Sequence, residues 1–169
     1  MSVTYRDAVP GDAPALEALF RDTFVATFGH LYGAEDLATF LAGHGEEKWR
    51  EELGDAAVAV RMAEDDGAAA GYLKLTPLRS PANTEAAAAE IGQLYVAARW
   101  HGSGVAAALM EWALGEARRR GARELYLSVF IDNHRARRFY QRYGFTVHGP
   151  NVFMVGNQAD EDVLMKLEL

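Results

Sequence analysis

The sequence predicts a single α/β domain over residues 1–169, built as a mixed, mostly antiparallel sheet flanked by helices. Its length of 169 residues, half of them hydrophobic, is enough for one domain with a real core. Helical periodicity dominates the first third of the chain, and alternating patterns dominate the rest. The unit from residue 90 to residue 130 is the one obvious parallel crossover, so the other strands are expected to pair antiparallel.

The first third predicts one strand followed by helices. Residues 3–9 alternate as a strand does, and the segment Pro10-Gly11-Asp12 ends this strand and offers Asp12 as a helix cap. Residues 35–41 and 46–53 predict further helical segments, separated near Gly43 and Gly45. The first helix carries an apolar stripe of Leu16, Leu19, Phe20, Phe24, Phe28 and Leu31.

The middle of the chain predicts a β-hairpin and a longer strand. Residues 56–63 and 69–75 flank Asp65-Asp66-Gly67, whose Asp-Gly step supplies the positive φ that hairpin turns need. Residues 77–84 are expected to form a loop, and alternation resumes over residues 90–96. Gly92 inside this strand predicts a β-bulge that splays the sheet.

A glycine pair then separates a strand from a helix in the stretch WHGSGVAAALMEWAL, which starts at Trp100. Gly102 and Gly104 let main-chain N–H groups approach a ligand without an intervening Cβ. The N-terminus of the helix that follows adds roughly half a positive charge. This helix is expected to run to about Arg120 and to end at Gly121. The junction therefore predicts a phosphate-binding site.

The C-terminal part predicts a strand, a short helix and two closing strands. The strand covers residues 125–130, and Asn133 caps a helix that ends at Gly144. Residues 145–147 and 163–167 are the expected closing strands. In the preceding helix, Leu109, Trp112 and Leu114 are expected to be core contacts, and three arginines, Arg118, Arg119 and Arg120, suit its C-terminus.

Composition excludes several classes of function. With 17 Lys and Arg against 24 Asp and Glu, the formal charge of −7 argues against a nucleic-acid partner. The absence of cysteine excludes disulfides, thiolate metal sites and a cysteine nucleophile. Neither a secretory segment nor an apolar run of about 18 residues occurs, so we expect a cytoplasmic protein with no membrane partner. His30 and His44 lack spaced partners, and no metal is expected.

Two nucleotide-binding interpretations compete for the glycine pair. Residues 102–107 fit the dinucleotide fingerprint G-x-G-x-x-A, and Glu124 follows Gly104 by 20 residues, the spacing of the ribose-binding acid. However, Glu124 precedes the strand of residues 125–130, and the remaining chain is short for the second half of a dinucleotide fold. A Walker A loop is excluded because Gly-Lys-Ser/Thr does not occur.

Two motifs carry a resemblance to a known family. The stretch RWHGSGVA, from Arg99, resembles the Q/R-x-x-G-x-G/A signature of the GNAT N-acetyltransferases. The stretch LSVFIDNHRARRFYQRYGF, from Leu127, resembles the motif that follows it, and the matching positions are Asn133, Ala136, Phe139, Tyr140, Gly144 and Phe145. The match covers residues 90–145. It implies a GNAT-like sheet with a splayed parallel pair at the cofactor site, and acetyl-CoA as co-substrate.

The resemblance also implies which residues bind acetyl-CoA. Main-chain N–H groups of one segment would hold the pyrophosphate: His101, Gly102, Ser103, Gly104, Val105 and Ala106. Three strand residues would pair with the pantetheine arm like an added strand: Leu94, Tyr95 and Val96. The N–H of Val96 would face the thioester oxygen, and Asn133 would contact the cofactor. His101 stands where many family members have arginine, so the resemblance implies the backbone contacts to phosphate there but not a side-chain contact.

Acetyl transfer by direct attack of an amine needs a proton donor and a proton acceptor. Tyr140 matches the tyrosine that protonates the CoA sulfur in the family, and the alternative is an aromatic residue packed beside Phe139. Glu90 matches a carboxylate used as general base, usually through water, and the alternative is an exposed charge at a strand end. The basic residues Arg135, Arg137 and Arg138 are expected to be solvated rather than bound to the CoA 3′-phosphate.

The acceptor follows from a looser similarity. The stretch DTFVATFGHLYGAEDLATFL, from Asp22, is similar to bacterial spermidine/spermine-type acetyltransferases. Asp22, Glu35 and Asp36 are candidates to attract a cationic amine, although helix starts also explain them. We expect an N-acetyltransferase that acts on a polyamine or small primary amine, then an amino acid, then a protein amine. The alternative is a non-catalytic acyl-CoA-binding sensor. A homodimer is left open.

Overall fold

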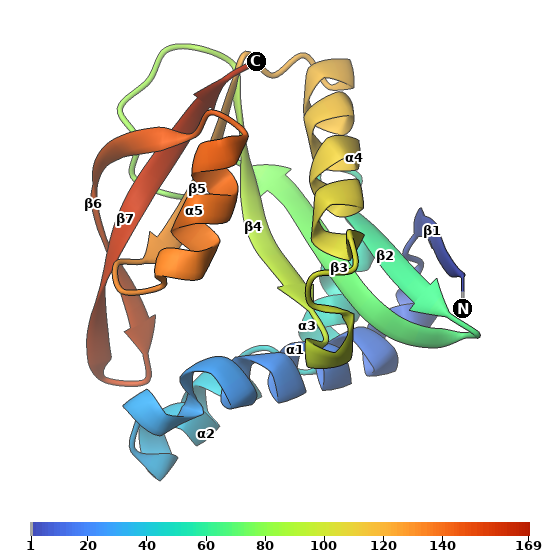
Figure 1. Ribbon diagram of the computed structural model, residues 1–169. Coiled ribbons are helices and arrows are strands. Elements are labelled where there is room, and N and C mark those ends of the chain that lie inside the picture. The colour runs from blue at the N-terminus through green and yellow to red at the C-terminus, as the bar shows by residue number, and fades with distance from the viewer. Residues whose placement is uncertain (1) are drawn as a thin grey trace.

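A seven-stranded sheet forms the framework of the computed structural model, which describes residues 2–169 (Figure 1). The strand order is β1-β2-β3-β4-β5-β7-β6, and within the described residues only β4 and β5 pair in parallel. The strands are β1 (Val3–Asp7), β2 (Ala59–Asp65), β3 (Ala68–Pro77), β4 (Ala88–Val96), β5 (Glu124–Phe130), β6 (Thr146–Val155) and β7 (Gln158–Glu168). The predicted mixed, mostly antiparallel sheet is confirmed.

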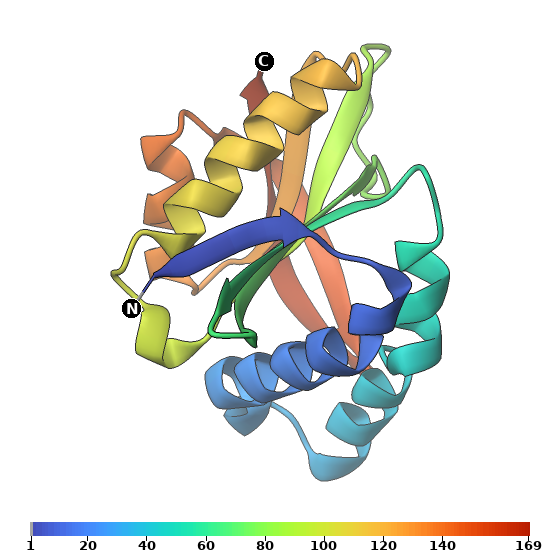
Figure 2. The same ribbon diagram turned by 90° about the vertical axis from the view of Figure 1, so that its right-hand side faces the viewer.

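Helices cover both faces of this sheet, as Figure 2 shows. One face carries α4 and α5, and the opposite face carries α1, α2 and α3. The helices are α1 (Ala13–Phe28), α2 (Ala34–Ala42), α3 (Glu46–Leu53), α4 (Val105–Arg119) and α5 (His134–Arg142). Three short 3-10 turns cover Pro10–Asp12, Gly29–Leu31 and Ala98–Trp100. Each face has its own apolar cluster, because each strand sends alternate side chains to opposite sides.

The N-terminal segment differs from the prediction in one detail. Strand β1 ends at Asp7, and Asp12 directly precedes α1, but its carboxylate does not cap that helix. Both Asp12 oxygens accept hydrogen bonds of 2.8 Å from the guanidinium of Arg6, and Oδ2 also accepts one from the N–H of Val9. A bidentate, charge-assisted pair is stronger than a single cap bond, so the capping role predicted for Asp12 is wrong.

The predicted hairpin and bulge are both present. Asp66 and Gly67 have φ values of +50° and +79°, so the turn between β2 and β3 uses the positive φ that the Asp-Gly step provides. Between β3 and β4 the register changes from Lys74 opposite Gln93 to Leu75 opposite Ile91, which leaves Gly92 unpaired. Gly92 is therefore a β-bulge, at the point where β4 begins to bend away from β5.

The C-terminal hairpin is much longer than the expected strands of residues 145–147 and 163–167. Strands β6 and β7 pair along almost their entire lengths, with a turn between Val155 and Gln158. Near this turn, the usual pattern of buried apolar and exposed polar side chains is reversed. The edge strand β6 exposes Val152 and Met154, whereas β7 buries Asp160 and Asp162. Apolar-inward patterning therefore could not identify this part of the sheet.

Strands β4 and β5 pair only along their first halves. Ala88 to Ile91 pair with Glu124 to Leu127, and beyond this point the two strands diverge (Figure 1). This arrangement confirms the predicted splayed parallel pair. None of the helices in the described residues has both the length and the apolarity needed to cross a membrane.

Candidate active site

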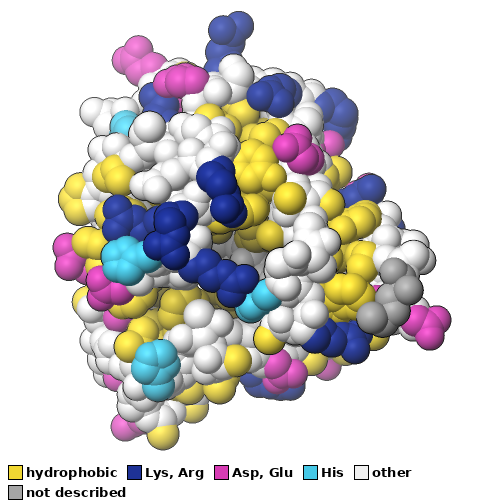
Figure 3. All heavy atoms as spheres, viewed as in Figure 1, with side chains coloured by type: hydrophobic (Ala, Val, Ile, Leu, Met, Phe, Trp, Pro, Cys, Tyr) yellow, Lys and Arg dark blue, Asp and Glu magenta, His cyan; other side chains and the backbone are white. Residues whose placement is uncertain are grey.

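A cavity of about 840 Å³ opens where β4 and β5 diverge. Its walls come from these two strands, from β7, from α1 and α5, and from the turn that precedes α4. In Figure 3 a hollow is visible on this face, with Lys and Arg side chains gathered beside it. Arg135 and Arg142 of α5 are among the lining residues. Described residues from both faces of the sheet thus meet at one site.

The turn before α4 presents unused main-chain donors. Gly102 and Gly104 have φ values of +76° and +91°, and a Cβ at either position would meet no atom within 4 Å. The N–H groups of His101 and Ser103 are used inside the turn, where they donate to the carbonyls of Ala98 and Trp100.

Four other N–H groups of this segment find no acceptor in residues 2–169: those of Gly102, Gly104, Val105 and Ala106. Gly102 and Gly104 lie in the loop before α4, and Val105 and Ala106 lie in the first turn of the helix. The helix dipole also favours negative charge at this position. The segment is therefore built to bind an anion, and these four residues are the part of the predicted 101–106 segment with donors available.

The second half of β4 has an unpaired edge facing the cavity. Because the N–H of Ala97 donates to the carbonyl of Ala70 in β3, the residues that alternate with it, Tyr95 and Gln93, also face β3. The main-chain groups of Leu94 and Val96 consequently point away from β3, toward the diverging β5. An extended ligand can add to this edge as a strand does. Tyr95 contributes its side chain to the cavity instead.

His101 connects three elements around this edge. Its Nε2 lies 2.9 Å from the carbonyl oxygen of Val96, and its Nδ1 lies 3.1 Å from the guanidinium of Arg135. A carbonyl oxygen only accepts and a guanidinium only donates, so Nε2 is the donor to Val96 and Nδ1 is the acceptor from Arg135. The His101 side chain therefore fixes the end of β4 against the start of α5.

Asn133 and Arg137 both form side-chain hydrogen bonds to the backbone at the start of α5. The Asn133 side-chain oxygen accepts from the N–H of Ala136 at 3.3 Å, as predicted for a helix cap, and the residue also lines the cavity. Arg137 donates to the carbonyl of Ile131 at 2.8 Å. Of the three arginines considered for a phosphate, Arg135 is the one that lines the cavity, whereas Arg138 does not reach it.

Tyr140 is a buried tyrosine whose hydroxyl lacks a partner within residues 2–169. Its side chain is 9% exposed and lines the cavity, and its ring packs edge-on against Phe139 and Phe145. Burial raises the pKa of this phenol to about 12, so it stays protonated at neutral pH. Packing holds the ring, and the hydroxyl remains available as a proton donor.

Glu90 is 7% exposed, so its interpretation as an exposed charge at a strand end is wrong. Its Oε1 accepts a hydrogen bond of 3.0 Å from the N–H of Ser80, which holds the carboxylate at the cavity wall. A buried carboxylate with one fixed oxygen and a second oxygen available is a suitable proton acceptor.

Near Glu90, the cavity has a cationic end whose charges are already paired. Lys74 forms a buried ion pair with Glu52 and lies 4.1 Å from the ring centroid of Trp49. Arg79 also contacts Glu52, at 3.2 Å. Burial lowers the pKa of Lys74, and the charge of Glu52 opposes this effect.

The opposite end of the cavity is acidic, which the sequence analysis missed. Asp160 and Asp162 of β7 are 9% and 5% exposed and line the cavity. Asp160 accepts hydrogen bonds from the Tyr32 hydroxyl and from Gln158, and Asp162 accepts one of 2.7 Å from Ser128. Burial raises the pKa of Asp162, the charge of Asp160 adds to this rise, and the Ser128 bond opposes it.

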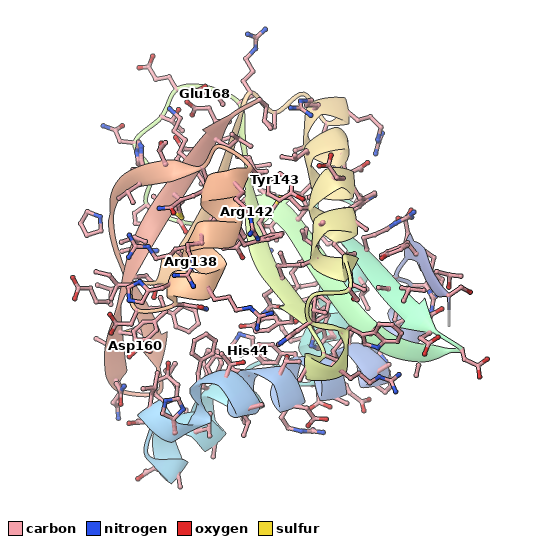
Figure 4. All side chains as sticks on the ribbon, in the orientation of Figure 1. His44, Arg138, Arg142, Tyr143, Asp160 and Glu168 are labelled. Carbon is pink, nitrogen blue, oxygen red and sulfur yellow. The ribbon has the colours of Figure 1, made fainter. Side chains whose placement is uncertain are left out.

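The acidic residues expected near the acceptor lie elsewhere. Asp22 and Glu35 are exposed, Asp36 accepts from the N–H of Asn157, and none of the three lines the cavity. Figure 4 shows Asp160 and His44 at the end of the sheet near α1 and α2, with Glu168 at the opposite end. The alternation of Asp160 and Asp162 directly before an apolar strand was the signal that could have identified them.

The two histidines of the first third also differ. His44 lines the cavity between the rings of Phe20 and Phe40, and its Nδ1 lies 2.9 Å from the Phe40 carbonyl. Burial lowers its pKa, so the ring is neutral. His30 is exposed. Within residues 2–169, no group of three or more potential metal ligands is present.

Glu124 has a structural environment rather than a ligand-binding one. Its carboxylate contacts Lys166 at 2.6 Å, Thr84 at 2.5 Å and Tyr126 at 3.0 Å, and it does not line the cavity. These hydrogen bonds, led by that of Lys166, lower the pKa of Glu124 to about 2. Glu124, the residue that the dinucleotide interpretation needs for ribose binding, instead links β5 to β7 through Lys166.

Comparisons with known proteins agree with this geometry. The acetyltransferase (GNAT) family model matches residues 14–145. An uncharacterised N-acetyltransferase of Mycobacterium tuberculosis is 33% identical over 159 residues, which cover 94% of this chain and 98% of the relative. Another, from Lactobacillus delbrueckii subsp. lactis, is 32% identical over 161 residues, with 94% and 92% covered.

A solved structure shares the fold. The PaiA N-acetyltransferase of Thermoplasma acidophilum, in complex with coenzyme A, has a TM-score of 0.81 to this chain. The sequence identity is 21%, and the similarity covers 100% of both chains.

Proposed function

The chain belongs to the acetyltransferase (GNAT) family, and from this we propose that it moves the acetyl group of acetyl-CoA to a primary amine of a small acceptor. One observation carries the proposal. The donor-rich turn before α4, the unpaired edge of β4 and the hydroxyl of Tyr140 all border a single cavity.

The residues present fit acetyl-CoA. The available N–H groups of Gly102, Gly104, Val105 and Ala106 suit its pyrophosphate. Leu94 and Val96 offer main-chain donors and acceptors to the amides of its pantetheine arm. The coenzyme A bound by the PaiA protein supports the same ligand here.

Acetyl-CoA supplies a thioester, on whose carbonyl carbon the neutral amine forms a C–N bond as the C–S bond breaks. We assign the Val96 N–H to stabilise the negative charge that develops on the carbonyl oxygen. Tyr140 then gives its proton to the departing sulfur, which a protonated phenol of raised pKa does at neutral pH. Glu90 takes up, through water, the proton that the amine nitrogen loses. The chain contains no cysteine, which favours direct attack.

The acceptor we propose is a polyamine or another small primary amine, with an amino acid as the second candidate. The specific observation that favours an amine without a carboxylate is the pairing of Lys74 and Arg79 with Glu52 at the cationic end. These cations are already neutralised in part, so they are poor partners for a second carboxylate.

The experiment that tests this function is a measurement of acetyl-CoA-dependent thiol release with a panel of polyamines, monoamines, amino acids and peptides. We expect release with at least one small amine. Acetyl-CoA at about 100 times its Kd should also stabilise the fold by about 2.7 kcal/mol. Stabilisation without thiol release across the panel would instead support a non-catalytic acyl-CoA sensor. A stabilisation seen with NADH alone would overturn the acetyl-CoA assignment.

A further inference from the structure

Two buried carboxylates in the cavity lack a cationic partner. Asp160 and Asp162 accept hydrogen bonds only from neutral groups of Tyr32, Gln158 and Ser128, and neither forms an ion pair within residues 2–169. Buried charges are normally paired, because removing a carboxylate from water is costly. The acidic end of this cavity is therefore complementary to a cation that the described chain does not supply.

A second observation points to a ligand at the same place. One oxygen of Asp162, Oδ1, makes no hydrogen bond in the described residues, although the side chain is only 5% exposed. The Tyr140 hydroxyl, in a side chain 9% exposed, also has no partner there. Both atoms border the cavity rather than being enclosed by the protein, so a ligand in the cavity can supply their missing contacts.

The two groups belong to one continuous space. Tyr95, Tyr140 and Asp162 all line the same cavity. Asp162 is opposite Phe130 in the β5–β7 pairing, and β5 separates it from β4. Neighbouring strands are about 4.8 Å apart, which places Asp162 on the order of 5–10 Å from the gap between β4 and β5. A short alkyl chain spans this distance.

The cavity walls near the acidic end suit such a chain. The ring of Phe24 stacks on Tyr32 with centroids 5.9 Å apart, and Phe40 packs against Phe153 with centroids 5.6 Å apart. All four side chains line the cavity. Aromatic faces accommodate methylene groups and also attract ammonium groups.

We propose that Asp162, with Asp160 beside it, binds a second ammonium group of the acceptor while the first amine is acetylated at the gap between β4 and β5. The acceptor is then a diamine or longer polyamine, not a simple monoamine or an amino acid. This inference rests on the proposed acetyl transfer. The neutral attacking amine lies near Glu90 and Tyr140, and the charged, unreactive amine lies near Asp162.

Three acceptors with the same carbon chain test this proposal: putrescine, n-butylamine and γ-aminobutyrate. They present an ammonium, a methyl and a carboxylate group, respectively, to the acidic end. We expect kcat/KM to be at least about tenfold higher for putrescine than for n-butylamine, as a charge-assisted hydrogen bond predicts, and lowest for γ-aminobutyrate. Equal values for putrescine and n-butylamine, or the highest value for γ-aminobutyrate, would overturn the proposal.

The variant Asp162→Asn assigns the preference to this residue. The Ser128 hydroxyl can still donate to the new amide oxygen, so the substitution changes charge with little change in shape. We expect the ratio of kcat/KM for putrescine to that for n-butylamine to fall at least about tenfold. The control variant Asp22→Asn removes an exposed carboxylate outside the cavity and should keep the wild-type ratio. A ratio that Asp162→Asn does not change would contradict the assignment.

A binding measurement separates failure of this inference from failure of the proposed function. Putrescine should raise the Tm of the wild-type protein in the presence of CoA, and this shift should shrink in Asp162→Asn. If no amine is acetylated while the Asp162-dependent shift remains, the proposed function fails and the ammonium site stands. If amines are acetylated but putrescine gives no such shift, the ammonium site is wrong.

Discussion

His101 Nε2 donates a hydrogen bond of 2.9 Å to the carbonyl oxygen of Val96, at the end of the unpaired edge of β4. Replacing His101 by alanine removes this bond and the contact with Arg135. Because the bond holds an edge assigned to acetyl-CoA, KM for acetyl-CoA should rise by about 2–10-fold, the usual effect of one lost hydrogen bond. Steady-state kinetics should show a smaller change in kcat, and His101→Gln should restore part of the loss. A fall in kcat with KM unchanged would contradict the positioning role.

Gly104→Ala should weaken acetyl-CoA binding at least tenfold, because its methyl group would stand where the turn meets the pyrophosphate. The residue has φ of +91°, so the substitution should also cost roughly 1 kcal/mol in the free energy of unfolding. Calorimetric titration with acetyl-CoA and chemical unfolding measure the two effects.

Gly121→Ala is the matched control for this strain. Gly121 follows α4 at its other end with φ of +87°, and a Cβ there also meets no atom within 4 Å. Both variants should lose similar stability, and only Gly104→Ala should lose affinity. Equal affinities in the two variants would show that the turn before α4 is purely structural.

Tyr140→Phe should lower kcat by about 10²-fold or more while acetyl-CoA affinity stays nearly intact. The ring and its packing against Phe139 and Phe145 are retained, so the loss is that of the hydroxyl. Because the pKa of Tyr140 is raised to about 12, the hydroxyl stays protonated over the accessible pH range. The factor by which the substitution lowers kcat should therefore be constant from about pH 6 to about pH 10. A kinetic pH profile checks this.

Tyr143→Phe, at the residue directly after α5, provides the control. Its hydroxyl contacts the Ala107 carbonyl at 3.5 Å, and it is not among the cavity residues (Figure 4). Its kcat should match that of the wild-type protein. Turnover by Tyr140→Phe at the wild-type rate would remove the proton-donor role.

Glu90→Gln should give a different pH profile. The glutamine oxygen can still accept from the Ser80 N–H, so the fold is preserved while the proton acceptor is lost. The defect in kcat should be about 10²-fold near neutral pH and should shrink as pH rises, since more of the amine is then already neutral. A decrease in kcat that does not depend on pH would show that Glu90 has only a structural role. If Glu90→Gln has the kcat of the wild-type protein, another group accepts the proton of the amine.

Local signals in the sequence predicted the parts of the fold that depend on neighbouring residues. Asp66-Gly67 specified a hairpin turn, Gly92 a bulge and Gly121 the end of α4, because each needs a backbone conformation that few residues adopt. Asn133 was also predictable, because its side-chain oxygen accepts from an N–H only three residues away. The capping role predicted for Asp12 failed because the side chain of Arg6, in the preceding strand, binds its carboxylate instead.

The acidic end of the site depends on long-range packing, which local patterns do not report. Asp160 and Asp162 read as polar positions of a loop, and only the pairing of β7 with β5 and β6 turns them into the cavity. Tyr140 and Glu90 were identified through the family resemblance, and their roles stay predictions. So do the cytoplasmic location, the single domain over residues 1–169 and the possibility of a homodimer.

The most direct test of the central claim is the stoichiometry of acetyl transfer. Wild-type protein is incubated with acetyl-CoA and putrescine, thiol release is followed with a chromogenic reagent, and the acetylated amine is quantified by mass spectrometry. The account predicts equal amounts of acetylated amine and CoA thiol, both strongly reduced in Tyr140→Phe. Thiol release without acetylated amine would mean thioester hydrolysis. Together with an equal rate in Tyr140→Phe, that result would contradict acetyl transfer at this site.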